Sequence, residues 1–421
     1  MIKKIVLSSL VACLGIADTT YTVDQLITQA LHNAPNLQSA QYSYDASRFY
    51  KKEAQSSYLP RIDLVGQATQ SSISSTEDKL LMGSLSLKQL VYDFGGISSD
   101  IASADAQSKS LLMQIKRFIV EKKRDVKESY YKVLEAQALI EVQKENIKLN
   151  EAQLYRAQRY FEAGIRTKID ISDAKVTLIQ AKIALKNAQY NLELAYAQLD
   201  RIVGFHDAIR TYTITQPHLN LESLCSTLSE YPLTLENAII YGYKHRYEIE
   251  EQQYYIKKYQ HQIKRAQSQY YPSVYIVGDY TKSDTQKLRS YFPKESWNIG
   301  LGVDMNLYAG GATQAHTQAK KIESSRASTQ LQDLKLAIKQ EITQAYFKVQ
   351  KSADTVALAQ TLLEVSKEKF YQATKRYEHG LCDYIELQQS RQGYIDAKAT
   401  LIIDYYNYYI ARAYLDSALG K

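Results

Sequence analysis

The amino-acid sequence predicts an α+β membrane protein in which a unit of helix, β-hairpin and long helix occurs twice in tandem. Three observations lead to this fold class. Residues that break helices are scarce, with 6 Pro and 16 Gly among 421 residues. Two short segments alternate apolar and polar residues with the period of a β-strand. Landmark residues also recur at a nearly constant offset along the chain, which is typical of a duplicated sequence.

The first 17 residues have the features of a secretory signal peptide. Two lysines precede an apolar stretch at residues 5–14, and small residues follow up to Ala17. This order of a positive region, an apolar region and small residues is typical of a cleaved leader. Alternatively, residues 10–13 form a lipoprotein cleavage box in which Cys13 is lipidated. Both interpretations predict export across an inner membrane.

Four long helices are predicted from the distribution of helix breakers. Residues 61–216 and 294–421 contain no proline, and glycine is rare in both stretches. Both are rich in Ala, Gln, Lys, Glu and Leu, which favour helices. The first helix would be about 100 Å long at the α-helical rise per residue, which indicates coiled-coil packing rather than a compact domain. We expect helices at about 97–162, 170–203, 312–378 and 384–418.

A β-hairpin is predicted before each pair of long helices. In residues 297–307 apolar residues alternate with small or polar ones, and residues 81–87 alternate in the same way. This period of two indicates strands with one apolar face. Each segment follows another candidate strand, which begins after Pro60 or Pro272. We expect hairpins at about 60–94 and 272–308, with polar loops at about 71–79 and 282–295.

The two halves of the chain contain the same landmarks in the same order. The offset is 212 residues between the prolines that precede the hairpins, 215 between two Gly-Gly pairs, and 216 at three later landmarks. A nearly constant offset over this length indicates a tandem duplication. The predicted organisation is a signal peptide at 1–17, repeat 1 at 18–204, an equatorial connector at 205–232 and repeat 2 at 233–421. The turns between the long helices fall at about 163–169 and 379–383.

Two hairpins supply too few strands for one chain to close a barrel. About eight strands make the smallest useful barrel, and an open sheet with an apolar outer face would leave its edges exposed. Strands with one apolar and one polar face fit a membrane barrel that faces lipid outside and a lumen inside. We therefore expect several chains to contribute strands to one barrel, and their helices to form a second, hollow cylinder.

Several doubled motifs carry a family resemblance. They are Tyr58-Leu59-Pro60 before the first strand, Gly95-Gly96 and Gly310-Gly311 after the hairpins, Phe161-Glu162-Ala163-Gly164 and Tyr377-Glu378-His379-Gly380 at the turns, and Leu199-Asp200 with Gly204 and Leu415-Asp416 with Gly420 at the repeat ends. Each motif alone is weak, but their order and doubling are specific. Over the whole mature chain the sequence resembles the outer-membrane efflux protein family, the TolC-like channels.

This resemblance implies an assembly and a function. The expected assembly is a homotrimer with a twelve-stranded β-barrel in the bacterial outer membrane and a long α-helical barrel in the periplasm. The expected function is that of a passive exit duct for efflux or type I secretion. A periplasmic adaptor, also called a membrane fusion protein, would connect the duct to an inner-membrane pump.

The resemblance also assigns two carboxylates to a periplasmic gate. Asp170 and Glu386 each lie six residues after a turn glycine, Gly164 or Gly380. They match family positions where acidic side chains surround the constriction. Six carboxylates in a trimer would favour cations and bind divalent ions, because a narrow mouth focuses the electric field. The simpler alternative is an acid in the first turn of a helix, where the helix dipole favours it.

Residues near the same turns are candidates for a lock that holds the gate shut. Tyr377 matches a tyrosine that serves this purpose in some family members. Cys382 occupies a position where those members have an arginine, which removes the usual lock. Arg166 is at the equivalent position in the first repeat and is a candidate substitute. Three Cys382 thiols near a threefold axis would also suit a soft metal ion, but an ordinary exposed thiol is the favoured interpretation.

The Gly-Gly pairs have a structural explanation. Gly95, Gly96, Gly310 and Gly311 stand where the chain passes from a strand to a long helix. A positive φ angle, which glycine adopts most easily, is expected at this change of direction.

Other functional classes are not supported by the sequence. The net charge of +7 arises from 52 basic and 45 acidic residues, so nucleic acid is not an expected partner. The seven histidines are scattered, and motifs for phosphate binding or a nucleophilic serine do not occur. We therefore expect no enzymatic activity, no cofactor and no metal site. The alternative function is a secreted or periplasmic helical protein with a structural or adhesive role and no pore.

Overall fold

The computed structural model describes residues 19–73, 76–205, 232–286 and 295–421, together with Arg210, residues 212–214 and three leucines at positions 221, 224 and 228. The predicted signal peptide, including Cys13, lies outside the described residues. Most of the predicted connector at 205–232 also lies outside them.

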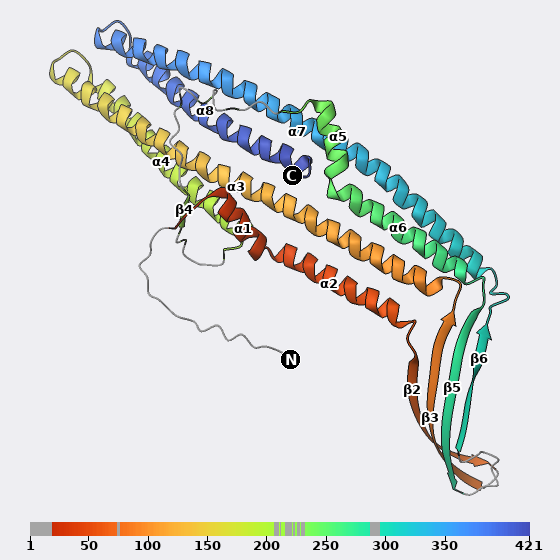
Figure 1. Ribbon diagram of the computed structural model, residues 1–421. Helices are drawn as coiled ribbons and strands as arrows, with labels where there is room; N and C mark the ends of the chain where they lie inside the picture. The colour runs from red at the N-terminus through yellow and green to blue at the C-terminus, as the bar shows by residue number, and fades with distance from the viewer. Residues whose placement is uncertain are drawn as a thin grey trace. The chain divides into compact units, whose positions relative to one another are not determined.

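The described chain is mostly helical and contains one larger sheet, as the sequence predicts (Figure 1). In order, its elements are β1 (Thr19–Tyr21), α1 (Val23–Asn33), α2 (Pro35–Ser56), β2 (Arg61–Ile73), β3 (Thr76–Tyr92), α3 (Gly96–Glu162), α4 (Lys168–Val203), β4 (Tyr212–Ile214), α5 (Leu235–His245), α6 (Tyr247–Ser268), β5 (Ser273–Gln286), β6 (Glu295–Asp304), α7 (Ala312–Glu378) and α8 (Tyr384–Ala418).

The two longest helices, α3 and α7, each contain 67 residues. No proline falls within either, and each ends at a turn that contains a glycine with positive φ. Helix α4 begins at Lys168, two residues before its expected start, with Thr167 at the N-cap. Among the described residues, the helices lack the length of apolar sequence that a membrane crossing requires.

The four long strands form one antiparallel sheet in the order β2-β3-β5-β6. Strand β2 pairs with β3 from Arg61↔Lys88 to Ile73↔Thr76. The expected loop at 71–79 is therefore wrong, because the ladder continues through these polar residues. The second loop is also shorter than expected, since β5 extends to Gln286. Strands pair through backbone hydrogen bonds, which polar residues can form as well as apolar ones. The polar residues at the ends of these strands were therefore mistaken for loops.

The chain divides into two units, which are described separately. The first contains Met1–Pro35, Ile119–Tyr241 and Glu341–Lys421. In its described part, a large cluster of buried apolar side chains comes from α1, α3, α4, β4 and α8, and includes Leu26, Val133, Leu199 and Ile402. Polar contacts join α3 to α8 beside this cluster: Glu145 accepts a hydrogen bond from Tyr394 at 3.1 Å and forms an ion pair with Lys398.

A short parallel pair, β1 with β4, was not anticipated from the sequence. It joins residues 19–21 to residues 212–214. The rings of Tyr212 in β4 and Tyr21 in β1 pack edge to face, with their centroids 5.6 Å apart. Strands of three residues are too short to show a period of two, so this pairing left no recognisable pattern.

The second unit contains Asn36–Phe118 and Gly242–Gln340, and includes the sheet. Helix α2 is joined to α3 by an ion pair between Lys51 Nζ and Asp105 Oδ1 at 2.6 Å. Helix α6 is joined to α3 by Arg265 and Asp100, whose side chains lie 2.8 Å apart. Ion pairs thus connect α3 to both α2 and α6 in this unit.

Candidate functional site at the two helical turns

The two turns between the long helices have nearly the same backbone. Gly164 has φ 71° and Gly380 has φ 73°, the left-handed region that favours glycine. At the first turn, the amide of Ile165 donates to the carbonyl of Tyr160 at 2.9 Å. At the second, the amide of Leu381 donates to the carbonyl of Arg376 at 2.8 Å. Both helices therefore end in the same type of hydrogen-bonded cap.

Arg166 connects the first turn to the second. Its Nη2 atom donates to the carbonyl oxygen of Cys382 at 3.3 Å. The same guanidinium lies 5.0 Å from the ring centroid of Tyr377, a distance that allows a cation–π interaction. The structure thus brings together the three residues that the sequence suggested for a lock.

Two further arginines contribute to this site, and sequence reasoning missed both. Arg376 forms an ion pair with Glu386 across the second turn, and its Nη2 donates to the carbonyl of Leu381 at 3.3 Å. Arg156 on α3 pairs with Glu378 on α7, with 3.4 Å between Nη1 and Oε1. Arg376 and Glu386 are 10 positions apart in the sequence, and Arg156 and Glu378 are 222 apart. The spacing of neighbours on one helix could therefore not predict either ion pair.

The two predicted gate carboxylates differ in their surroundings. Both lie in the first turn of their helices, Asp170 in α4 and Glu386 in α8. Glu386 has Arg376 as its ion-pair partner, whereas the described residues provide no ion pair for the half-buried Asp170. The charge of Glu386 is therefore partly balanced by an ion pair, whereas that of Asp170 is not balanced in this way among the described residues.

A small apolar core lies beneath the turns. Its buried members are Ala157, Ala174, Ala373, Tyr377, Tyr384 and Leu387. Tyr384 shares a hydrogen bond of 3.0 Å with Thr177 Oγ1, whereas the buried hydroxyl of Tyr377 has no hydrogen-bond partner. Burial raises the pKa of the Tyr377 hydroxyl above its usual value. The positive charge of Arg166 lowers this pKa, and the negative charge of Asp170 raises it further.

Cys382 is half-buried, and its thiol donates to the carbonyl of Ala373 at 3.5 Å. Burial raises the pKa of this thiol, and the negative charge of Glu386 adds to the effect. The neutral thiol is therefore favoured at neutral pH. In the described part of the chain, no group of three or more His, Cys, Asp or Glu side chains could hold a metal ion.

The glycines between strand and helix follow the expectation with one exception. Gly95, Gly310 and Gly311 have positive φ angles of 86°, 62° and 83°. Gly96 does not, so the expectation of a positive φ is wrong there. Its requirement is space: a Cβ atom would lie 2.6 Å from a carboxylate oxygen of Asp93 and 2.6 Å from the Arg265 guanidinium.

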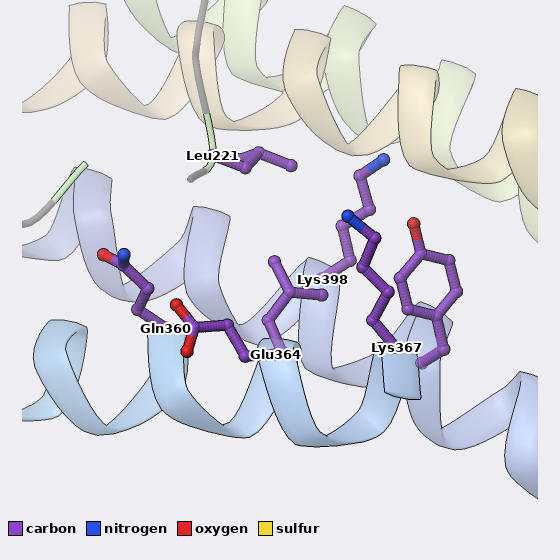
Figure 2. A pocket seen from close by; sticks show the side chains of 7 residues that line it. Leu221, Gln360, Glu364, Lys367 and Lys398 are labelled. Carbon is purple, nitrogen blue, oxygen red and sulfur yellow. The ribbon is translucent and has the colours of Figure 1, made fainter. Parts of the chain in front are cut away.

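The first unit also contains a cavity of about 390 Å³ away from the turns. Figure 2 shows its lining: Gln360, Glu364 and Lys367 on α7, Lys398 on α8, and Leu221 from the connector. Lys398 is already paired with Glu145. The lining therefore contains two lysines and one glutamate, and one of these lysines is held by a carboxylate outside the cavity.

A sequence profile of the family described as "Outer membrane efflux protein" matches residues 26–205 and 243–421. These two segments cover most of the chain and contain both turns. The chain belongs to the outer membrane efflux protein family. Members of this family are channel proteins, and the chain is accordingly an outer-membrane channel that extends into the periplasm and serves efflux or secretion.

Curated relatives of this outer membrane efflux protein include two with informative names. The alkaline protease secretion protein AprF of Pseudomonas aeruginosa is 22% identical over 92% of this chain and 82% of its own length. The outer membrane protein TolC of Escherichia coli is 25% identical over 53% of this chain and 44% of its own length.

Solved structures show the same fold at low sequence identity. CusC superposes with a TM-score of 0.82 at 17% identity, covering 98% of this chain and 95% of its own. The outer membrane protein VceC of Vibrio cholerae superposes with a TM-score of 0.80 at 17% identity, covering 94% of this chain and 96% of its own. The fold of the efflux protein family is thus present along nearly the whole chain.

Proposed function

We propose that three copies of this chain form a passive exit duct whose periplasmic end is gated at the two helical turns. The observation that carries this proposal is the grouping of Asp170, Arg166, Tyr377, Cys382 and Glu386 at adjacent turns of one chain. The duct would receive its cargo from an inner-membrane pump through a periplasmic adaptor, and would perform no chemistry itself.

The sheet supports a homotrimer. In the described residues, β2 and β6 each pair on one side only, so the sheet has two open edges. Open edges are ready to pair with another chain. Three copies would supply twelve strands, enough to close a barrel with a lumen. The strands have 10 to 17 residues, and about 9–11 suffice to cross an outer membrane.

The repeat organisation, with repeats at 18–204 and 233–421 joined by a connector at 205–232, remains part of the proposal. Its support is that α3 and α7 have equal length, 67 residues each, and end in turns with the same backbone geometry. A duplicated unit would place two turns per chain, and six per trimer, at one end of the helical barrel.

The gate would use carboxylates to select ions and slow their passage. A trimer would place three Asp170 and three Glu386 side chains around one lumen. Such a ring attracts cations and holds divalent ions most strongly, because their attraction scales with charge. Stabilisation by the helix dipole is a second effect at the same positions and does not exclude this one.

The lock would be Arg166 rather than an arginine at position 382. The hydrogen bond to the Cys382 carbonyl and the cation–π contact with Tyr377 join the two turns of one chain. Opening would separate the turns and break these contacts. Gly164 and Gly380 would allow the tight turns that place the contacts, and Gly95, Gly96, Gly310 and Gly311 would join the barrel strands to the helices.

The names of the relatives support two kinds of cargo. AprF is named for secretion of a protease, and BepC of Brucella suis, 19% identical over 65% of this chain, is named as an efflux protein. Both kinds of cargo are compatible with a wide lumen that has no tight binding site. The pump and the adaptor would then select the cargo.

The test is single-channel conductance of the purified protein in a planar bilayer, with and without Mg²⁺ or Ca²⁺. We expect small, cation-selective conductance steps that divalent ions reduce. A correctly folded, membrane-inserted oligomer with no conductance under any condition, including partner proteins, would support the pore-free structural alternative instead.

A further inference from the structure

We propose that a small inorganic anion, chloride, binds beside Arg391 in a buried polar layer between α3, α4 and α8. All the residues that carry this inference belong to the first unit of one chain. The inference therefore depends neither on the gate nor on the homotrimer.

The polar layer separates two clusters of buried apolar side chains. On α3, Ala157 belongs to the cluster beneath the glycine turns, and Val142 belongs to the larger cluster farther from them. The buried residues between these two positions are Asn146, Asn150 and Gln153. Spacings of three and four residues place all five on one face of the helix. The apolar core of α3 is thus interrupted by three consecutive polar positions.

Helix α8 contributes a buried arginine to the same layer. Leu387 and Ile395 belong to the two apolar clusters, and the buried residues between them are Ser390 and Arg391. Arg391 is only 4% exposed, which is rare for an arginine. Its Nε atom has no hydrogen-bond partner, and no carboxylate of the described chain forms an ion pair with it.

The guanidinium of Arg391 lacks a counter-charge. Burial lowers its pKa, and the neighbouring hydroxyl of Tyr384 opposes this effect. An arginine nevertheless stays protonated in a protein, and a phenol is neutral at neutral pH. An unbalanced charge in the interior costs free energy, which an anion from solution would offset.

Gln153 lies at the level that the Arg391 side chain reaches. The hydrogen bond between Tyr394 and Glu145 sets the register of α8 against α3. Gln153 is eight residues after Glu145, which brings it about 12 Å nearer the glycine turns. Tyr384 is ten residues before Tyr394, or about 15 Å nearer the same turns. Because the guanidinium of Arg391 interacts with Tyr384, it extends toward the level of Gln153.

The groups at this level suit an anion better than a water molecule. The Nε of Arg391 and the Nε2 of Gln153 are buried N–H donors without partners. The Tyr384 hydroxyl shares its hydrogen bond with Thr177 of α4, which closes the third side of the layer. Water would accept hydrogen bonds from the two donors but would leave the charge unbalanced. Gln153 is 5% exposed, so an enclosed site of this kind favours a small ion such as chloride.

The first experiment measures the midpoint of thermal unfolding in detergent while sodium chloride replaces sodium gluconate at constant ionic strength. We expect the midpoint to rise by several degrees and then level off, because an ion that binds the folded chain stabilises it. Bromide should act like chloride. Arg391→Met should abolish the dependence. Arg159→Met changes an exposed arginine on α3 and is the matched control, which should keep the dependence.

The second experiment replaces the anion with a side chain of the protein. Gln153→Glu keeps the size of the side chain and adds a carboxylate beside Arg391. The midpoint in gluconate should then rise, and chloride should no longer change it. Gln158→Glu, at an exposed position of α3, is the control and should leave the chloride dependence intact. This variant decides the question even where Arg391→Met does not fold.

A third measurement locates the ion directly. Crystals grown in bromide should show an anomalous-scattering peak beside Arg391. A midpoint that does not respond to chloride, or a response that survives both Arg391→Met and Gln153→Glu, would overturn the inference. Asn150 Oδ1, a buried acceptor without a partner, would then be the group to which Arg391 donates. None of these results concerns conductance, so the proposed duct is tested separately.

Discussion

The two turns of this channel share a backbone but differ in the side chains that they contribute. Gly164 and Gly380 have φ angles within a few degrees of each other. The first turn supplies Arg166, which contacts the second turn, while the equivalent position there is Cys382. The second turn instead supplies the contact partners, which are a carbonyl oxygen and the ring of Tyr377.

The comparison shows that the backbone and the side chains of the two turns can differ independently. Turn geometry depends on a glycine and on backbone hydrogen bonds, so it survives many substitutions nearby. The polar contacts between the turns depend on individual side chains. Of the two turns, only the first contributes an arginine at this position, Arg166, and its guanidinium donates to the carbonyl of Cys382 in the second.

The largest expected effect comes from Arg166. Arg166→Ala removes the contacts to both Cys382 and Tyr377, and we expect single-channel conductance to rise several-fold because the turns separate more easily. Arg159→Ala is the control, since the Arg159 side chain hydrogen-bonds to Tyr155 and Glu162 of its own helix. Equal conductance in the two variants would assign no locking role to Arg166.

The turn glycines should respond alike. Gly164→Ala and Gly380→Ala both place a side chain at positive φ, where a Cβ would otherwise meet open space. Each should cost about 1–2 kcal/mol of stability through backbone strain alone. Thermal unfolding in detergent, followed by circular dichroism, checks this. A much larger loss at one glycine would show that the backbones are not equivalent.

Removing the hydroxyl group should lower the stability of the protein at Tyr384 but not at Tyr377. Tyr384→Phe removes the hydrogen bond to Thr177 and should cost about 1 kcal/mol. Tyr377→Phe removes a buried hydroxyl that has no partner, and should be neutral or stabilising by about 1 kcal/mol. The midpoint of thermal unfolding is the readout. Destabilisation by Tyr377→Phe would reveal a hydrogen bond that this hydroxyl makes in the assembly.

The smallest expected difference lies at the helix N-caps. Asp383 accepts a hydrogen bond from the amide of Glu386 at 2.8 Å, whereas Thr167 makes no side-chain cap. Asp383→Ala should therefore cost about 0.5–1 kcal/mol, and Thr167→Ala close to nothing. The same thermal measurement compares them, and a larger loss at Thr167 would contradict the assignment of the caps.

The sequence predicted what depends on long patterns. Stretches without proline marked α3 and α7, and alternation marked β6, because these signals extend over many residues. It did not predict the β1–β4 pair, whose strands have three residues each. It also missed the pairing of Arg376 with Glu386, because contacts across a turn depend on tertiary packing rather than on helical spacing.

The sequence predicted which residues lie at the candidate site, but few of the contacts that they make there. Matching the two halves of the sequence identified Arg166 as the counterpart of Cys382, and the structure places the two in contact. The different environments of Asp170 and Glu386 could not be read from the sequence, since both lie six residues after a glycine. Only the folded turn shows that Arg376 accompanies one of them.

The most direct test of the gate compares divalent block in Asp170→Asn, Glu386→Gln and the double variant in planar bilayers. We predict that the double variant needs at least about ten times more Mg²⁺ for half-block, and that Asp170→Asn has the larger single effect because Glu386 is paired with Arg376. Glu53→Gln, an exposed acid on α2, is the control. Unchanged block in the double variant would contradict the assignment of these carboxylates to the gate.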